Sequence, residues 1–327
     1  MSHYLVTGCA GFIASRVSEL LVEAGHTVSG IDNLNDAYDP RLKHWRLERL
    51  CALPGFAFAQ ADISDRAGLE AIWRTQPKPE AIFNLAARAG VRQSVENPSV
   101  YFETNVTGTL HLLELARRDG VQRFLLASTS SLYGASNEMP YREDSDTGRP
   151  LSPYAASKKA AEALCHCYHH LYGMDIAVPR FFTVYGPAGR PDMSAFRFVQ
   201  WISEGRPVTV YGDGTQKRDF TFVDDIARGA IAAALSVKGF EVFNLGSDRP
   251  VELMQAIRSI EALVGKPARL EFESAHRADV NATWANIEKA KLAFGWSPRT
   301  HFQEGLESLV RWYRDNAAWA RLIETGV

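Results

Sequence analysis

The stretch Thr7-Gly8-Cys9-Ala10-Gly11-Phe12-Ile13-Ala14 decides the fold of this chain. It follows a short apolar run at 4–6 and opens a periodic apolar segment at 12–24, which predicts a strand, a tight glycine turn and a helix. Glycine lets a ligand's phosphates approach the backbone closely, and the N-terminus of a helix offers unpaired N–H donors. We therefore expect a pyrophosphate-binding loop that includes Gly8, Gly11, Phe12 and Ile13.

Acidic residues follow the next two predicted strands. Asp32 ends the strand at 27–31, about 24 residues after Gly8, and a carboxylate at this spacing accepts both ribose hydroxyls of an adenosine. The same carboxylate would repel a 2′-phosphate, so the pattern favours NAD over NADP. Asp62 follows the strand at 56–58 and is placed to reach the adenine edge.

Short apolar runs alternate with longer periodic segments up to residue 181. Further strands are predicted at 81–85, 123–127 and 176–181, and helices at 67–74, 100–118 and 154–172. This alternation predicts an α/β fold, a doubly wound parallel sheet of the Rossmann type. Glycine and proline become frequent after Pro187. We expect residues 1–180 to form the nucleotide-binding domain, with part of about 217–245 returning to it, and residues 181–327 to form a smaller C-terminal substrate-binding lobe.

The composition restricts the classes of function. The chain has 327 residues, and 36 basic against 38 acidic side chains give a formal net charge of −2, which provides no general attraction to nucleic acid or anionic lipid. Four cysteines are too few for a disulfide scaffold and indicate a reducing compartment. No apolar run approaches the roughly 20 residues of a membrane span, and no basic and apolar leader opens the sequence. We expect a cytoplasmic protein that binds neither nucleic acid nor membrane.

A tyrosine and a lysine share one face of the helix predicted at 154–172. Tyr154 and Lys158 are four residues apart. A nearby ammonium, together with a positive nicotinamide, lowers the pKa of a phenol from its usual value of about 10, and a tyrosinate can act as general base on an alcohol. Thr129 ends a predicted strand, where parallel sheets gather their ligands, and its hydroxyl is placed to hold the same oxygen. We expect Thr129, Tyr154 and Lys158 to be catalytic.

With Asn84-Leu85-Ala86-Ala87, Asn105 and Arg218-Asp219-Phe220, these residues give the chain a strong resemblance to the extended short-chain dehydrogenases/reductases. Over nearly its whole length it resembles their NAD-dependent nucleotide-sugar epimerases and dehydratases. The resemblance implies NAD held through turnover, a UDP-sugar in the C-terminal lobe, and a homodimer whose four-helix interface uses helices near 106–118 and 155–172. It departs at Cys9, where most relatives have glycine. The cofactor contacts that it implies include Asn33, Ile63, Leu85, Ala86, Ala87, Asn105, Ser128 and Phe181.

Three segments resemble UDP-glucuronate 4-epimerases in particular. They are 32–43, Ala89-Gly90-Val91-Arg92, and the run from Arg180-Phe181-Phe182-Thr183 to Arg190-Pro191-Asp192-Met193. Related 4,6-dehydratases have an Asp-Glu pair in place of Ser130-Ser131, and UDP-glucuronate decarboxylases have Glu in place of Ser131. Since this chain has no acid at either position, a simple 4-epimerase is favoured. The hydroxyls placed to donate to a sugar carboxylate are those of Thr129, Ser130, Ser131 and Thr183.

Basic residues of the second half are candidates for binding the UDP diphosphate, because arginine suits bidentate phosphate contacts. They are Arg190, Arg218 and Arg277, with Tyr211 and Asp279 near the nucleoside and Arg92 as a further substrate contact. Arg277 matches less well, since Ala278 replaces the glycine that usually precedes the aspartate.

Other readings stay open. They are a 4-epimerase of UDP-glucose or UDP-N-acetylhexosamine, a UDP-glucuronate decarboxylase, and a non-catalytic NAD-sensing regulator. The run Cys165-His166-Cys167-Tyr168-His169-His170 suggests a metal site. However, consecutive ligands on a helix point in different directions, and no second cluster completes a tetrahedral set. We therefore expect these residues to pack structurally and predict no metal.

Overall fold

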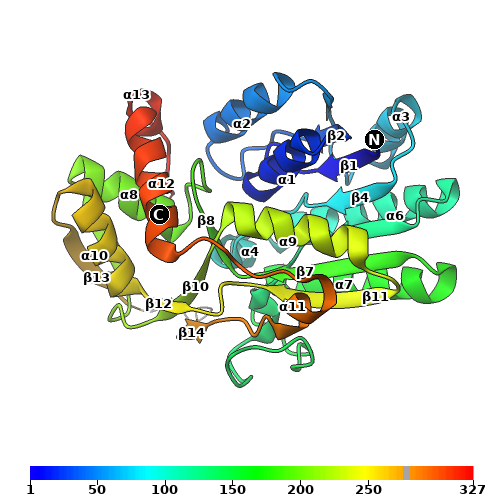
Figure 1. Cartoon of the computed structure of the whole chain (residues 1–327). Helices are drawn as coiled ribbons and strands as arrows, with labels where there is room; N and C mark the ends of the chain where they lie inside the picture. The colour runs from blue at the N-terminus through cyan, green and yellow to red at the C-terminus, as the bar shows by residue number, and fades with distance from the viewer. Residues whose placement is uncertain (275–279, 327) are drawn as a thin grey trace.

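The computed structural model describes residues 1–274 and 280–326. A large parallel sheet runs in the order β11-β7-β5-β4-β1-β2-β3, with the short β6 paired to the end of β7 (Figure 1). The predicted α/β class with a doubly wound parallel sheet is confirmed. The strands are β1 (His3–Thr7), β2 (Thr27–Asp32), β3 (Phe56–Gln60), β4 (Ala81–Asn84), β5 (Arg123–Leu126), β6 (Ser128–Thr129), β7 (Asp175–Phe181) and β11 (Phe240–Leu245).

The winding of the sheet changes direction between β1 and β4. Strands β2 and β3 lie on one side of β1, and β4, β5, β7 and β11 lie on the other. The two central strands pair in parallel from Tyr4 opposite Ala81 to Thr7 opposite Asn84. Because the connections that leave β1 and β4 diverge, the carboxyl ends of these strands border the crevice in which open α/β sheets bind ligands.

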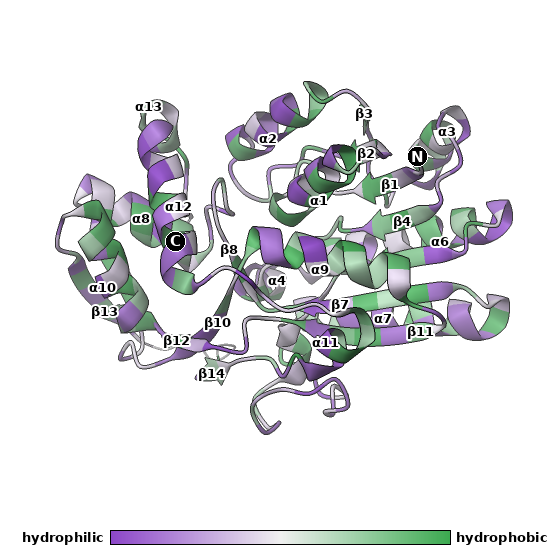
Figure 2. Cartoon of the chain, viewed as in Figure 1, coloured by the Kyte–Doolittle hydropathy of each residue, from purple (hydrophilic) through white to green (hydrophobic). Residues whose placement is uncertain are grey.

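Helices cover both faces of the large sheet. On one face α1 (Phe12–Glu23) packs against α9 (Val223–Ser236) and α2 (Arg41–Cys51), and Val17, Leu21 and Ala230 are part of that core. On the other face α3 (Arg66–Thr75) and α7 (Pro153–Tyr172) pack against α6 (Gly108–Asp119), and Leu69 and Leu112 are part of the second core. Figure 2 shows hydrophobic residues on the central strand β4 and mixed hydropathy along the covering helices. This pattern is typical of a sheet buried on both sides.

One predicted helix is observed as three pieces. The segment predicted at 100–118 consists of α5 (Pro98–Phe102), a π-helical turn at Glu103–Thr107, and α6. Such turns widen a helix locally and are frequent at functional sites; here the turn carries Thr104 and Asn105. The apolar pattern predicts neither α2 nor α4 (Val91–Glu96). Helix α2 carries charged side chains through every turn, and α4 has only six residues.

Smaller sheets form the C-terminal part. One runs in the order β12-β10-β14, with β8 paired to β10, and β9 pairs with β13. Helices α8, α10 and α12 pack around them with a core that includes Phe196, Val199, Ile257 and Leu309. The elements are β8 (Thr183–Tyr185), α8 (Ser194–Glu204), β9 (Pro207–Tyr211), β10 (Lys217–Phe222), β12 (Pro250–Glu252), α10 (Leu253–Val264), β13 (Arg269–Glu273), β14 (Ala282–Thr283), α11 (Glu288–Phe294), α12 (Phe302–Asp315) and α13 (Ala317–Ala320).

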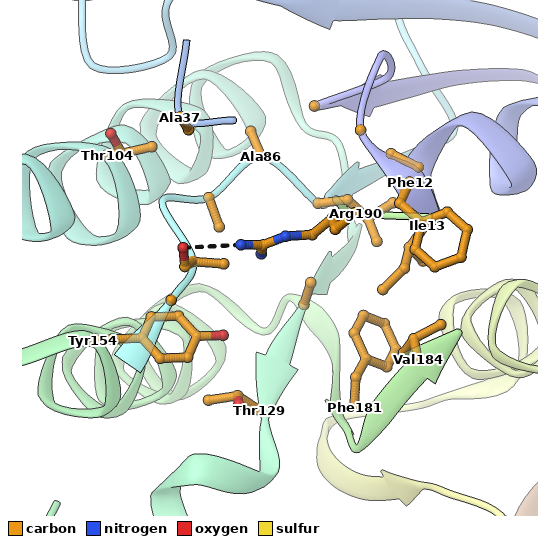
Figure 3. Close-up of a pocket in the computed structure, with 18 of the residues that line it drawn as sticks. Phe12, Ile13, Ala37, Ala86, Thr104, Thr129, Tyr154, Phe181, Val184 and Arg190 are labelled. Carbon is orange, nitrogen blue, oxygen red and sulfur yellow. Dashed lines mark hydrogen bonds between the residues drawn. The ribbon is translucent and has the colours of Figure 1, made fainter. Parts of the chain in front are cut away.

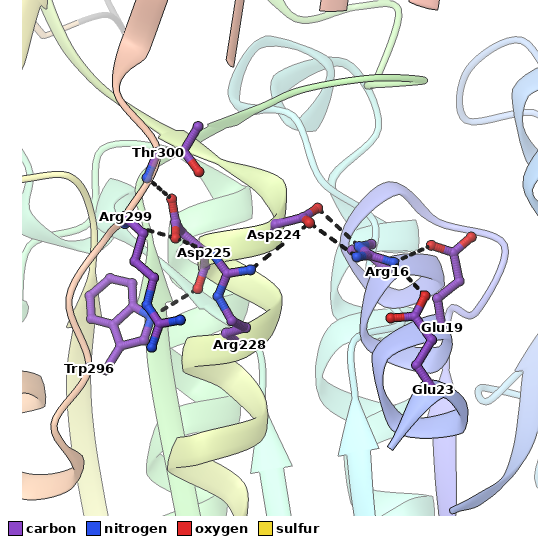
Figure 4. Close-up of polar contacts among 9 residues, drawn as sticks. All are labelled: Arg16, Glu19, Glu23, Asp224, Asp225, Arg228, Trp296, Arg299 and Thr300. Carbon is purple, nitrogen blue, oxygen red and sulfur yellow. Dashed lines mark hydrogen bonds and ion pairs between the residues drawn. The ribbon is translucent and has the colours of Figure 1, made fainter. Parts of the chain in front are cut away.

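A polar cluster on α9 joins the two parts of the chain (Figure 4). Arg16 of α1 donates to both carboxylate oxygens of Asp224, at 3.0 and 3.1 Å. The neighbouring Asp225 is fully buried and accepts from the backbone N–H groups of Arg299 and Thr300, each at 2.9 Å. Helix α9 and strand β11 thus pack with the large sheet, whereas β10, which precedes them, belongs to a smaller one. Across the described ranges, none of the helices combines the length and the apolar character needed to span a membrane.

Candidate active site

A cavity of about 350 Å³ lies at the carboxyl ends of the central strands (Figure 3). The glycine loop, the ends of β2, β4 and β6, the start of α7 and the segment 181–193 all contribute to its lining. It therefore lies where the strand order predicts a ligand. The lining includes nearly all of the cofactor contacts expected from the sequence: Gly8, Gly11, Phe12, Ile13, Asp32, Asn33, Asp62, Ile63, Leu85, Ala86, Ala87, Ser128, Tyr154, Lys158 and Phe181.

The glycine loop forms a cradle whose close backbone packing requires glycine at two positions. Gly8 has a φ of +70°, and a Cβ at that position would lie 2.8 Å from Cα of Ala86. A Cβ on Gly11 would lie 2.8 Å from the carbonyl oxygen of Gly8. No side chain caps the N-terminus of α1, so its N–H groups remain available to an anion. This loop fits a dinucleotide pyrophosphate.

Cys9 points away from the cradle. Its side chain is fully buried, and its Sγ lies 2.8 Å from where a Cβ of Gly30 would stand, beside the ring of Phe56. Burial raises the pKa of this thiol well above its ordinary value. The departure from glycine at position 9 is thus accommodated in the core below the loop, and it leaves the phosphate site open.

Two carboxylates stand at the far end of the cavity. Asp32 accepts from the backbone N–H groups of Ala10, at 3.2 Å, and Leu34, at 2.8 Å, which fixes its orientation. Asp62 accepts from Nδ2 of Asn33 at 2.7 Å. Both side chains line the cavity.

Lys43 lines the cavity, although no motif in the sequence predicts it as a site residue. It is 5% exposed, its Nζ lies 3.7 Å from Asp32, and it donates to Asn35 at 2.9 Å. Burial lowers its pKa, although the charge of Asp32 opposes the shift. Asn35, Ala37 and Tyr38 line the same wall. The signal that could have found them is the segment 32–43, which marks a family resemblance but carries no known cofactor motif of its own.

The proposed catalytic group is assembled where β6 meets α7. Burial raises the pKa of the Tyr154 phenol, while the nearby Thr129 side chain and the charge of Arg190 oppose that shift. The sequence predicts that Lys158 lowers this pKa, but the structure differs. Lys158 donates through Nζ to the carbonyl of Ala127 at 2.9 Å, and burial lowers its own pKa to about 8. In the protein alone, Thr129 and Arg190 therefore favour the phenolate.

A buried ion pair supports this arrangement from behind. Glu162, one helical turn after Lys158, accepts from Nε and Nη2 of Arg180 at 2.9 and 2.7 Å, and from the hydroxyl of Ser128 at 2.6 Å. Its charge also favours the protonated form of Lys158. The pair ties β6, β7 and α7 together, and thereby fixes Thr129 relative to Tyr154.

Hydroxyls and one arginine surround the middle of the cavity. The predicted substrate contacts Thr129, Ser130, Ser131, Thr183 and Arg190 all line it. Arg190 extends across the cavity between Phe12 and Tyr154 in Figure 3, with Nη2 donating to the carbonyl of Ala89 at 3.3 Å. It also forms a two-point ion pair with Asp192 at 3.0 and 2.5 Å. Among the described residues, the only carboxylates in the lining are Asp32 and Asp62, so the wall beside Thr129 presents no acid to the cavity.

Other predicted residues lie outside this lining. Asn105 holds the backbone N–H and C=O of Arg88 and the hydroxyl of Ser157, which joins the loop before α4 to α7. The Arg92 guanidinium covers the Tyr211 ring at 4.0 Å, so these two substrate candidates do meet.

The remaining candidates are placed as follows. Arg218 on β10 donates to the carbonyl of Lys217 at 2.9 Å, and Arg277 and Asp279 lie outside the described residues. In the Cys165–His170 run, Cys165 is buried and Cys167 exposed, while the rings of His166 and Phe240 pack edge to face.

These features define a dinucleotide-dependent enzyme that acts on an alcohol. They are a glycine loop at the switch point of a parallel sheet, a carboxylate that ends the second strand, and a Tyr-Lys pair beside a threonine. The family described as "NAD dependent epimerase/dehydratase family" matches residues 4–246. The chain belongs to this NAD dependent epimerase/dehydratase family.

Similar proteins include a UDP-glucuronate 4-epimerase of Thermodesulfobacterium geofontis, which is 53% identical over 97% of each chain. Among solved structures, a UDP-glucuronic acid 4-epimerase from Bacillus cereus in complex with UDP-glucuronic acid and NAD gives a TM-score of 0.89 at 34% identity, covering 96% of this chain and 99% of that one. A UDP-glucose 4-epimerase of Thermotoga maritima with UDP-glucose gives a TM-score of 0.89 at 31% identity, with the same coverage.

Proposed function

We propose that this protein is an NAD-dependent UDP-glucuronate 4-epimerase, which interconverts UDP-glucuronate and UDP-galacturonate through a 4-keto sugar. The observation that carries the proposal is the cluster of Thr129, Ser130, Ser131 and Thr183 in the cavity lining, where no carboxylate of the described residues faces the cavity beside it. Elimination at C5 and C6 needs a second acid or base, which this wall lacks. Hydroxyls, in contrast, donate hydrogen bonds to a sugar carboxylate and do not act as acids or bases towards the sugar.

The chain's own residues fit NAD along the cavity. Gly8 and Gly11 leave room for the pyrophosphate at the start of α1, and Asp32 accepts from ribose hydroxyls. Lys158 has three N–H donors, of which one reaches Ala127 among the described residues, so it has donors left for the second ribose. When bound, NAD supplies the reversible oxidation of the sugar at C4.

Tyr154 moves the proton of the O4 hydroxyl. It accepts this proton when the sugar is oxidised and returns it when the other face of the ketone is reduced. The pKa of Tyr154 is raised in the protein alone, so its ionisation needs the additional positive charge that a nicotinamide brings. Thr129, which lines the cavity beside Tyr154, holds O4 at the same point.

The carboxylate must be held away from the carbonyl system that forms at C4. A 4-keto glucuronate is a β-keto acid, and it loses CO₂ when the bond from C5 to the carboxylate stands perpendicular to the carbonyl plane. Hydrogen bonds to a charged group contribute about 1.5–3 kcal/mol each. Several donors in the cluster therefore hold the carboxylate in another orientation while the ketone turns over.

Two lobes and two subunits complete the proposal. Residues 1–180, with α9 and β11, hold NAD, and the C-terminal lobe holds UDP through Arg218 and the pair Arg92 and Tyr211. The protein is a homodimer through α6 and α7, whose exposed apolar side chains include Leu110, Leu171 and Tyr172. Light scattering tests the dimer, and Leu171→Glu should yield monomers. A cytoplasmic location stays a prediction from the sequence.

Product analysis tests the function. The purified protein is incubated separately with UDP-glucuronate, UDP-glucose and UDP-N-acetylglucosamine, without added NAD, and the products are separated by chromatography. We expect UDP-galacturonate from the first substrate and much slower conversion of the other two. Tyr154→Phe serves as the inactive control. Preferential conversion of UDP-glucose, or release of a UDP-pentose from UDP-glucuronate, would assign the protein to a different reaction.

A further inference from the structure

Arg46 lies directly behind the glycine loop, on α2, and is 3% exposed. Its Nε and Nη2 both donate to the carbonyl of Ala188, at 3.1 and 2.6 Å, and Nη2 also reaches the carbonyl of Gly189 at 3.3 Å. Its Nη1 donates to the carbonyl of Ala10 and to the hydroxyl of Tyr38, both at 2.9 Å. All five N–H donors of the guanidinium thus have an acceptor.

None of these acceptors carries a negative charge. The other buried cations around the cavity have carboxylates close by, since Arg190 pairs with Asp192 and Lys43 lies near Asp32. Arg46 has no carboxylate within ion-pair distance in the part of the chain that the structure describes. A nearby carboxylate, that of Asp32, accepts from the N–H of Ala10 and is shared with Lys43, so two cations face one anion here. A buried cation whose own acceptors are all neutral keeps a net positive potential around it. An anion held on the glycine loop would experience that potential in a poorly solvated setting.

The same guanidinium fixes an unusual backbone conformation. Ala188 has a φ of +51°, in the left-handed region that non-glycine residues seldom adopt. The two-point hydrogen bond from Arg46 holds its carbonyl, and the chain continues directly to Arg190 in the cavity. Ala10, on the other side of Arg46, belongs to the glycine loop. Arg46 therefore connects the loop that receives the cofactor to the loop that presents Arg190.

We propose that Arg46 is a positioning residue, whose buried charge strengthens the binding of the dinucleotide phosphates and whose fork fixes the loop that carries Arg190. The inference rests on the proposed function, because it takes the glycine loop as the phosphate site. It separates two effects of one side chain. The charge acts on anionic ligands alone, whereas the fork acts on the geometry of the loop at 188–190.

Three variants separate these effects. Arg46→Met removes both charge and fork, Arg46→Lys keeps the charge and removes the fork, and Arg49→Met is the matched control. Arg49 is on the same helix, but its side chain is 59% exposed and lies over the ring of Trp45. Each protein is freed of nucleotide, and calorimetry gives its affinity for ADP-ribose, which carries the pyrophosphate, and for adenosine, which is neutral. Retention of NAD by the proteins as purified is measured in parallel.

The ratio of the two affinities is the readout that a purely structural role would leave unchanged. We expect Arg46→Met to lower the ratio of ADP-ribose to adenosine affinity about 10-fold, which corresponds to about 1.4 kcal/mol. Arg46→Lys should keep the ratio within about twofold but lower kcat, because Arg190 loses its support. Arg49→Met should match the wild-type protein in ratio, NAD retention and kcat.

The remaining outcomes would refute either the role of Arg46 or the proposed cofactor site. An unchanged ratio in Arg46→Met, with only a lower Tm, would limit Arg46 to the fold. If Arg46→Met does not fold, Arg46→Gln, which is neutral but keeps N–H donors, gives the same ratio. Failure of both neutral variants to fold, while Arg46→Lys folds with wild-type kcat, would also refute the proposed role. A wild-type protein that binds neither NAD nor ADP-ribose would instead overturn the proposed cofactor site.

Discussion

Replacing Thr183 by valine tests whether a hydroxyl controls the fate of the sugar carboxylate. Thr183 opens β8 and lines the cavity together with Ser130 and Ser131. The hydroxyl of Thr129 already donates to that of Ser131 at 3.2 Å. Within the part of the chain that the structure describes, the hydroxyls of Thr183 and Ser130 make no hydrogen bond, so they are the ones open to a ligand. Valine keeps the branched shape and removes the donor. The change therefore removes one of the hydrogen bonds that hold the carboxylate.

The expected magnitude follows from that single bond. A hydrogen bond to a charged group contributes about 1.5–3 kcal/mol. If the bond restrains the carboxylate in the 4-keto sugar, its loss lowers the barrier to decarboxylation relative to epimerisation by up to this amount. Since about 1.36 kcal/mol corresponds to a factor of ten in rate, the ratio of CO₂ to UDP-galacturonate should rise roughly 10- to 150-fold.

The assay follows both products from UDP-glucuronate in a reaction supplied with excess NAD. Carbon dioxide is trapped from a carboxyl-labelled substrate, and the UDP-4-keto-pentose and UDP-galacturonate are separated by chromatography. Thr209→Val is the matched control, because Thr209 is a similarly half-buried threonine on β9, outside the cavity. Equal slowing of both products in Thr183→Val, with no rise in the ratio, would refute the role assigned to Thr183.

Three further predictions concern the groups around the cavity. Tyr154→Phe should bind NAD and UDP-glucuronate normally but lose at least about 10²-fold in kcat, since only the proton acceptor is removed; a variant that keeps a tenth of the wild-type rate would contradict this role. The pKa of Lys158 is lowered from 10.5 to about 8 in the folded protein without nucleotide. The unfolded chain then binds more protons between pH 8 and 10.5, so the free energy of unfolding should rise with pH in this window, and urea titrations of Lys158→Met should lack that contribution. Arg180→Met leaves the carboxylate of Glu162 buried without its partner, and should lower the free energy of unfolding by about 3–5 kcal/mol; a loss below about 1 kcal/mol in urea unfolding would show that the pair contributes little.

The cofactor half of the site could be predicted because its signals are local in sequence. A glycine loop between a strand and a helix, an acid after the next strand, and Tyr154 one turn before Lys158 each place their side chains through the geometry of a single element. Strand ends then bring these elements to one edge of the sheet. Periodicity failed where tertiary contacts decide the structure, as in α2, whose highly charged sequence buries Lys43 and Arg46.

The supporting residues could not be found in this way. Glu162 and Arg180 meet only after α7 packs against β7, and nothing in the sequence near either residue names the other. Arg46 donates to the carbonyl of Ala188, which is 142 residues away in the sequence. The same argument explains why the pKa of Tyr154 is raised. Its burial, and the hydrogen bond that directs Lys158 to the carbonyl of Ala127, depend on how the site packs and not on the spacing of the two residues in the sequence.

The distribution of charge along the cavity gives a physical reason for the orientation in which a sugar nucleotide binds and for the preference for an acidic sugar. The acids Asp32 and Asp62 stand at one end, where they accept from neutral sugar and base groups and would repel a carboxylate. Arg190, which is paired with Asp192, crosses the middle, and the hydroxyls of the lining contribute donors and no negative charge. A sugar nucleotide with an acidic sugar is therefore repelled less at the hydroxyl end than at the end with the two acids. A neutral sugar gains less from the same arrangement, because hydrogen bonds between neutral groups contribute about half as much as those to a charged group. Selectivity for a uronic acid thus follows from where the acids are placed as much as from the hydroxyls that face the substrate.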